Sequence, residues 1–179
     1  DRQRHTLKVL DLMFAEDYLA EAEATVRQFQ PDLIGISLRN LDNGSYLDPK
    51  WFLPITKQVI QHIRPITRAT LVCGGPAFSI LPRECFGYLE PDLGIAGDAG
   101  ETFAELTDRL DAGEPYRHLP GLVYREDGQV IFNGVRASSY TIAWDKTRIM
   151  QEALSLELPL DKVWSCYEAG PERCWKCES

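Results

Sequence analysis

The sequence lacks any run of about 20 apolar residues, the length that a helix needs to span a bilayer. Its first residues, DRQRHTLKVLDLMF, do not show the basic, apolar and small-residue order of a secretory signal. No basic stripe stands out either, since 19 Lys and Arg face 27 Asp and Glu, for a formal net charge of -8. We therefore expect a cytoplasmic protein that binds neither membranes nor nucleic acid.

Cysteine is scarce and unevenly placed. Of the five cysteines, Cys73 and Cys85 lie in apolar segments, whereas Cys166, Cys174 and Cys177 crowd the C-terminus. A disulfide framework would distribute its cysteines through the chain, so this asymmetry argues against one. It favours metal chemistry at one end.

Apolar residues are plentiful, at 44% against 26% charged residues in 179. This composition excludes whole-chain disorder and suits one globular domain with a small appendage. Short apolar runs alternate with segments of helical periodicity, which predicts strands at 7–12, 33–37, 69–73 and 92–96. The helices expected after them make this a flavodoxin-like (Rossmann-like) α/β fold, a parallel sheet with helices on both faces.

The character of the chain changes after the last predicted helix, 101–112. Two alternating segments around Asp127 and Gly128 predict a β-hairpin over 121–134. A helix opened by Asp145 and a cysteine-rich tail follow. We therefore place a domain boundary near residue 137, with an α/β domain and its hairpin over 1–137 and a helix with a metal-knuckle tail over 138–179.

The candidate binding residues follow the predicted strands. In open α/β sheets, ligands bind beyond the carboxyl ends of the strands, so loops at these ends are informative. Paired glycines there admit positive φ and allow close approach to a flat ligand, although an isolated pair more often marks a tight turn. The candidates in these three loops are Ser37, Leu38, Arg39, Asn40, Gly74, Gly75, Gly97, Asp98 and Glu101.

Three segments in this order, LIGISLRNLDN, LVCGGPAFSILPRE and DLGIAGDAGETF, carry a resemblance to a known family. The chain resembles the cobalamin-binding domain of corrinoid methyltransferases and, more closely, of cobalamin-dependent radical S-adenosylmethionine enzymes. The likeness covers about residues 7–134. It implies a corrinoid cofactor, with Ser37, Leu38, Gly74 and Gly75 along its nucleotide tail. It also implies that the remaining candidates lie near the corrin ring, and that a catalytic radical domain acts in cis or in trans.

Corrinoid methyltransferases carry an Asp-x-His-x-x-Gly motif that supplies an axial cobalt ligand, and this sequence has no such motif. His5, His62 and His118 lie in other contexts, and each is expected to be a surface or packing residue. Many of the radical enzymes also lack this histidine. Its absence therefore leaves the cobalamin interpretation in place.

The tail presents its cysteines as C-x7-C-x2-C, and the C-x2-C pair has the spacing of a metal knuckle. Structural zinc normally takes four ligands, so Cys166, Cys174 and Cys177 are expected to need a fourth. The tail resembles the zinc-knuckle end of 7-cyano-7-deazaguanine synthases, although the Ser-Gly-Gly-x-Asp-Ser loop of those enzymes is absent. An iron-sulfur cluster, used with S-adenosylmethionine, is the rival interpretation of the same cysteines.

Three hypotheses follow for the whole chain. The first is a cobalamin-binding module of a radical enzyme, which holds the corrinoid for methyl transfer or a related reaction. The second is a zinc-containing protein of deazapurine biosynthesis. The third is a flavodoxin-like domain that binds no ligand tightly.

Overall fold

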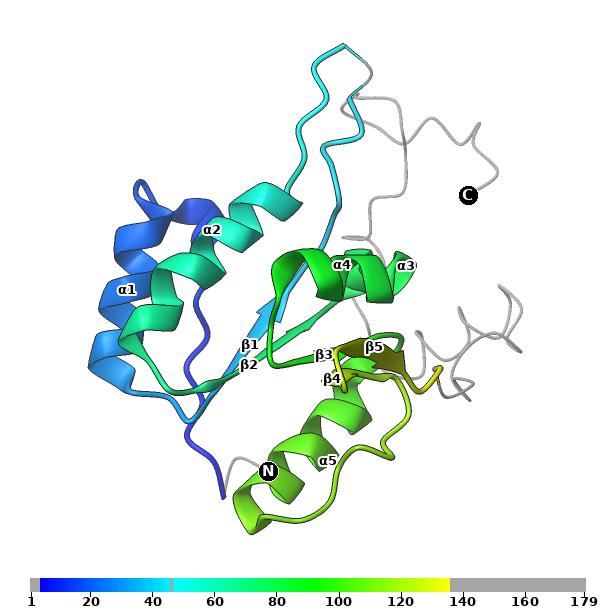
Figure 1. Ribbon diagram of the computed structural model, residues 1–179. Helices are drawn as coiled ribbons and strands as arrows, with labels where there is room; N and C mark the ends of the chain where they lie inside the picture. The colour runs from blue at the N-terminus through cyan, green and yellow to red at the C-terminus, as the bar shows by residue number, and fades with distance from the viewer. Residues whose placement is uncertain (1–3, 46, 136–179) are drawn as a thin grey trace, which may run out of the picture. The chain divides into compact units, whose positions relative to one another are not determined.

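A computed structural model describes residues 4–45 and 47–135, and Figure 1 shows their arrangement. Strands and helices alternate over the first two thirds of this part, and a hairpin closes it. In chain order the elements are η1 (Leu12–Phe14), α1 (Tyr18–Phe29), β1 (Leu33–Ser37), α2 (Leu53–Ile63), η2 (Arg64–Ile66), β2 (Thr70–Gly74), α3 (Pro76–Ile80), α4 (Pro82–Leu89), β3 (Leu93–Ile95), α5 (Ala99–Ala112), β4 (Leu122–Glu126) and β5 (Gln129–Phe132).

The five described strands form one sheet in the order β1-β2-β3-β4-β5. The pairs β1–β2 and β2–β3 are parallel, as predicted, while β3–β4 and β4–β5 are antiparallel. The predicted hairpin is thus confirmed, with Asp127 and Gly128 both at positive φ in its turn. The hairpin joins the edge of the parallel sheet and makes the whole sheet mixed.

The strand predicted at 7–12 is wrong. No strand forms there, and the side chains of Leu7 and Val9 are 73% and 78% exposed. An apolar run becomes a strand only when a neighbouring strand accepts its backbone hydrogen bonds. Residues 7–10 have no such partner among the described residues, where β1 forms one edge of the sheet.

The predicted helices are confirmed, with shifts at their ends. The α1 helix begins after Asp17, whose carboxylate accepts the backbone N–H groups of Leu19 and Ala20. The α5 helix begins two residues before the predicted Glu101 because Asp98 is its N-cap, and it ends at Gly113 in the left-handed conformation. The short α3 helix was not predicted.

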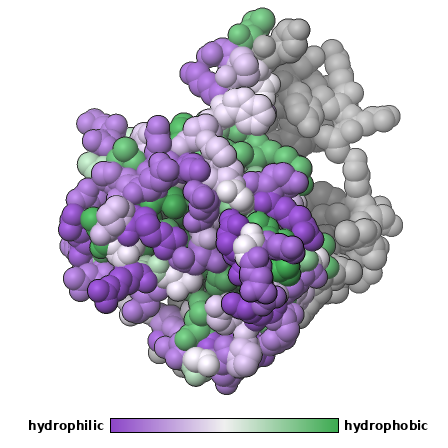
Figure 2. All heavy atoms as spheres, in the orientation of Figure 1, coloured by the Kyte–Doolittle hydropathy of each residue, from purple (hydrophilic) through white to green (hydrophobic). Residues whose placement is uncertain are grey.

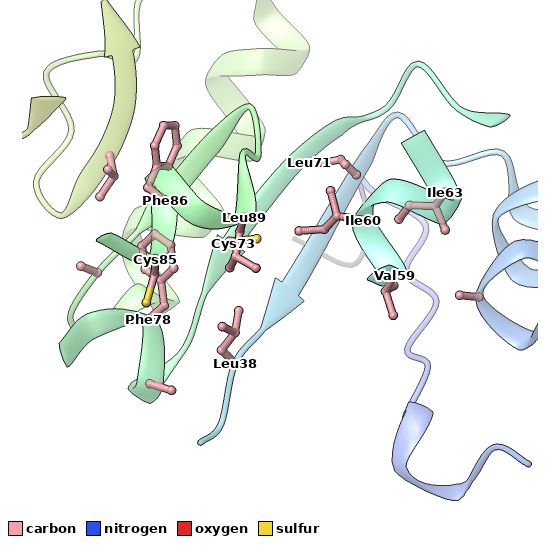
Figure 3. Close-up of a cluster of buried hydrophobic side chains, with 14 of the residues drawn as sticks. Leu38, Val59, Ile60, Ile63, Leu71, Cys73, Phe78, Cys85, Phe86 and Leu89 are labelled. Carbon is pink, nitrogen blue, oxygen red and sulfur yellow. The ribbon is translucent and has the colours of Figure 1, made fainter. Parts of the chain in front are cut away.

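Helices cover both faces of the sheet, as predicted. On one face, α1, α2, α3 and α4 contribute side chains to one buried cluster with Leu71 and Cys73 of β2, and Figure 3 shows this cluster. On the other face, α5 packs Leu106 against Val72 and Ile95. Side chains of β2 therefore alternate between two cores, which is why this strand is apolar throughout. This double burial fixes β2, whose carboxyl end carries Gly74 and Gly75.

No helix within the described ranges is long and apolar enough to cross a membrane. The helix expected after Asp145 and the three cysteines of the tail lie outside the described residues.

Candidate functional site

The carboxyl ends of β1, β2 and β3 meet at one edge of the sheet. The parallel register pairs Ser37 with Gly74, the last residues of β1 and β2, and Cys73 with Gly94 of β3. All three loops that contain predicted site residues therefore leave the sheet at the same edge. Sequence reasoning could place them there because parallel strands joined by helices must all point the same way.

The loops after β1 and β2 are joined by backbone hydrogen bonds. Leu38 donates its N–H to the Gly74 carbonyl at 2.8 Å, and Ala77 donates to the Leu38 carbonyl at 3.0 Å. The Leu38 side chain is buried, with 4% of its surface exposed. The two loops thus form one rigid unit, and Leu38 serves as a core residue at its centre.

Gly75 makes this packing possible. Its φ of 97° and ψ of 173° lie in a region that is essentially restricted to glycine. A Cβ here would lie 2.6 Å from the Leu38 carbonyl oxygen and 2.8 Å from Ser37 Oγ. The sequence suggested that the glycine pair leaves room for a ligand, but at Gly75 the neighbouring loop takes that room. A ligand at this edge must therefore lie on the first two strand tips, since the gap between them will not admit a methyl group.

Ser79 ties the third loop to the second, and sequence reasoning missed it. Its hydroxyl donates to the Gly75 carbonyl at 2.9 Å and accepts the N–H of Gly97 at 2.9 Å. A serine that bonds the carbonyl four residues earlier is a helical feature. The α3 segment was expected to be a loop. Without the helix, nothing in the sequence indicated that the Ser79 hydroxyl would lie between two strand tips.

Polar side chains surround this framework. Arg39 and Asn40 lie directly beyond β1 and are exposed, and Arg39 makes no ion pair with any described residue. Asp98 accepts the Gly100 N–H at 3.4 Å as the cap of α5, and Glu101 is exposed in the first turn of that helix. The edge therefore offers a cation, an amide and carboxylates, which can donate hydrogen bonds to polar ligand groups or accept them.

Other reactive groups of the described part lie elsewhere. His5 contacts Asp108 at 3.0 Å and His62 contacts Glu23 at 2.8 Å, so both rings pair with surface carboxylates. Burial raises the pKa of the Cys73 thiol to about 12, which makes it a core residue without nucleophilic character.

Within 4–45 and 47–135, no group of three or more potential metal ligands forms. The cysteines of the predicted metal site, Cys166, Cys174 and Cys177, lie outside these ranges. Two surface hollows also lie away from the strand tips, one along η1 and α1 and the other beside the amino end of β2. Within the described ranges, polar groups therefore gather at the sheet edge, and no metal centre forms.

Comparison with curated proteins finds relatives of different kinds. Tryptophan 2-C-methyltransferase of Streptomyces laurentii is 32% identical over 126 residues, 68% of this chain and 21% of that enzyme. A 7-cyano-7-deazaguanine synthase of Prochlorococcus marinus is 38% identical over 72 residues, 40% of this chain and 30% of the synthase. The chain therefore spans less than a third of either relative.

Comparison with solved structures gives the same fold. The radical S-adenosylmethionine methyltransferase TsrM from Kitasatospora setae, with tryptophan and an S-adenosylmethionine analogue bound, has a TM-score of 0.68 at 25% identity, over 74% of this chain and 25% of TsrM. The cobalamin-dependent radical enzyme OxsB, with aqua-cobalamin bound, has a TM-score of 0.58 at 18% identity, over 78% of this chain and 19% of OxsB.

The family model described as the B12 binding domain matches residues 1–107. This range contains β1, β2 and β3 with all three tip loops. The resemblance stated from the three sequence segments is thereby confirmed. With the sheet order, the shared edge of the three loops and this match in agreement, the chain belongs to the B12-binding domain family.

Proposed function

We propose that this chain holds a cobalamin at the carboxyl edge of β1, β2 and β3, as the cofactor-binding module of a radical S-adenosylmethionine enzyme. The observation that carries the proposal is the convergence of the three loops at one edge in a B12-binding family chain. The likeness to a tryptophan methyltransferase supports methyl transfer, or a related radical reaction, as the chemistry served.

The residues at this edge divide into two groups. Ser37, Leu38, Gly74 and Gly75 are assigned to the nucleotide tail, which would lie along their joined backbones. Arg39, Asn40, Gly97, Asp98 and Glu101 are assigned to the corrin ring and its amide side chains. The fit rests on the donor set, since exposed cationic, amide and carboxylate groups can bond both oxygen and nitrogen of primary amides. A bound corrinoid supplies the metal-centred chemistry, and the residues here bind and orient it.

The test is binding of hydroxocobalamin by the full 179-residue chain. We expect the corrinoid to remain with the protein through a desalting column, with a changed visible spectrum. A protein fraction that emerges colourless would contradict the proposal.

A matched pair of variants tests where the corrinoid lies. Arg39→Gln removes an exposed cation beside the β1 tip, and we expect about tenfold weaker binding, the effect of losing one charged hydrogen bond. Arg68→Gln removes another exposed arginine just before β2, at the opposite edge of the same sheet. It should bind as the parent does. If the parent, Arg39→Gln and Arg68→Gln bind hydroxocobalamin with equal affinity, Arg39 does not belong to the binding site.

We assign the reaction itself to a radical domain in cis or in trans. In the described residues His5 and His62 pair with surface carboxylates, and both described cysteines are buried. The relatives are three to five times longer than the part they share with this chain. We place this assembly in the cytoplasm, in keeping with the sequence.

For the tail we propose zinc bound by Cys166, Cys174 and Cys177, with a fourth ligand to be identified. The C-x2-C spacing and the likeness to deazaguanine synthases support this assignment. Elemental analysis of the purified chain should find zinc, and Cys174→Ser should reduce it. Iron and sulfide in place of zinc would favour the cluster interpretation.

The likeness to deazaguanine synthases is evidence about part of the chain alone. It covers 30% of the synthase, and the Ser-Gly-Gly-x-Asp-Ser loop on which the ATP chemistry depends does not occur in the 179 residues. We therefore propose no synthase activity for this chain.

A further inference from the structure

A two-stranded ribbon follows β1 and stands away from the helices and sheet in Figure 1. We define it as residues 41–45 and 47–52. Its base is closed by the bond from Phe52 N–H to the Leu41 carbonyl at 2.8 Å, and the bond from Asn43 N–H to the Lys50 carbonyl at 3.1 Å continues the pairing. Asp42 and Trp51 face each other as an antiparallel bridge between these bonds. The segment between β1 and α2 thus forms a paired ribbon.

The Asn43 side chain holds the ribbon in this shape. Its amide oxygen accepts the N–H of Lys50 at 2.9 Å and of Ser45 at 3.3 Å, and its amide nitrogen donates to the Asp48 carbonyl at 2.8 Å. One side chain therefore satisfies three backbone groups across the turn. The turn of the ribbon is therefore supported from within, while Leu41 at its base packs against the hydrophobic core.

This arm exposes large apolar side chains. Trp51 is 60% exposed near its base, and Leu47 is 93% exposed near its outer end, where Figure 2 shows apolar atoms. Neither residue belongs to either buried cluster. A preformed arm that exposes a tryptophan to water is typical of a binding surface. Because the arm is already folded, binding a ligand does not have to offset the entropy cost of ordering it.

The position of Trp51 relates it to the cofactor edge. The ribbon starts one residue after Asn40, so its base is continuous with the β1 tip. The tip residues are mainly glycine, polar or charged, and they can bond the amide groups of a corrin while offering little apolar contact. A corrin is a broad macrocycle that carries methyl groups as well as amides. An indole beside the tip supplies the missing apolar surface.

We propose that Trp51 packs against the corrin ring and that the ribbon is a wall of the cofactor site. The inference rests on the proposed function and adds a residue that lies outside the three tip loops. Trp51 touches the ring and leaves the nucleotide tail to Ser37 and Gly75. Leu47 lies at the outer end of the arm, farther along the ribbon from the β1 tip, and is assigned no contact with the ring.

The test compares two corrinoids, hydroxocobalamin and dicyanocobinamide, which lacks the nucleotide tail. In the full chain, Trp51→Ala should weaken binding of both by a similar factor of about ten, since ring contact is common to both. Trp51→Phe should restore much of the affinity. Asn43→Ala should also weaken both, because it releases the ribbon. Leu47→Ala is the matched control on the same arm and should change neither affinity by more than about twofold.

Three outcomes separate the alternatives. If the parent binds both corrinoids and Trp51→Ala binds them equally well, the ring contact is refuted and the ribbon is left as a surface for a protein partner. If Trp51→Ala weakens only hydroxocobalamin, Trp51 lies against the tail and the inference is wrong. If the parent binds neither corrinoid, the proposed function fails, and the inference fails with it. Because Asn43, Leu47 and Trp51 are all exposed, circular dichroism should show all variants folded.

Discussion

The substitution Gly75→Ala tests the packing of the first two strand tips. The backbone at Gly75, with φ of 97° and ψ of 173°, admits residues other than glycine at a cost of about 1–3 kcal/mol. The added Cβ would also meet the Leu38 carbonyl oxygen at 2.6 Å and its nitrogen at 2.8 Å. Both atoms belong to backbone, so neither can turn aside as a flexible side chain would.

The Leu38 atoms are also the ones that join the loops. Relief of the contact must lengthen the hydrogen bonds from Leu38 to Gly74 and from Ala77 to Leu38, each worth about 0.5–1.5 kcal/mol. Added to the backbone cost, the total loss is about 2–6 kcal/mol. A typical domain is stable by about 5–15 kcal/mol, so the variant should fold but unfold in less urea.

Equilibrium urea unfolding, followed by far-ultraviolet circular dichroism, measures this loss. Gly87→Ala is the matched control, because it is the same substitution at an exposed position of α4 with no atom within 4 Å of the new Cβ. It should raise the stability by about 0.5–1 kcal/mol, the helix propensity gain of alanine over glycine. A Gly75→Ala midpoint equal to that of the parent would refute the argument that the tips are packed against each other.

Three further predictions concern titration and hydrogen bonding. Burial raises the pKa of Cys73 from 9.0 to about 12, so between these pH values the unfolded chain loses a proton that the folded chain keeps. The free energy of unfolding should therefore fall as the pH rises, and urea unfolding from pH 9 to 11 should show a shallower fall for Cys73→Ala than for the parent. Hydrogen bonds from Arg27, then from His62, lower the pKa of Glu23 below 4.5, which stabilises the fold above pH 4.5 and no longer does so as the pH falls. Glu23→Gln should therefore be less stable than the parent at pH 6, and the melting temperatures of the two proteins should converge in acid. Asp92 accepts the N–H of fully buried Leu71 at 2.7 Å, so Asp92→Ala should lower the free energy of unfolding by about 1–3 kcal/mol. Asp92→Asn keeps an acceptor and should lower it less. Equal urea midpoints for the two variants would contradict this.

Local patterns predicted most of the fold. The periodicity of Leu19, Ala22 and Val26 identified α1, and the Asp127-Gly128 pair identified the hairpin, because both signals depend on nearby residues. The strand at 7–12 failed because a strand depends on a distant partner that no local pattern reveals. The antiparallel docking of β4 on β3 was missed for the same reason.

The candidate site was predictable at the level of the loops and less so at the level of contacts. Strand order and direction bring Ser37 and Gly74 side by side, and the sequence shows where each strand ends. The role of Ser79 depends on α3, a helix of five residues between Gly75 and the helix that begins at Pro82. Such a helix is too short to be detected by periodicity in the sequence. The Asn43 network depends on a turn of the ribbon, and its bonds span up to seven residues. Contacts of this kind follow from three-dimensional geometry.

The arrangement of the edge explains why binding and reaction are assigned to different parts. The joined tips are fixed mainly by backbone hydrogen bonds and by the Ser79 hydroxyl. The α3 helix starts two residues after Gly74, and the α5 helix starts two residues after Gly97. Such a platform can hold a large cofactor in one place without side chains that react with it, because rigidity comes from bonds that the ligand does not touch. A residue that improves binding can then lie on a separate support. Trp51, on an arm that Asn43 holds rigid, meets this condition, and its removal should change affinity without loosening the strand tips.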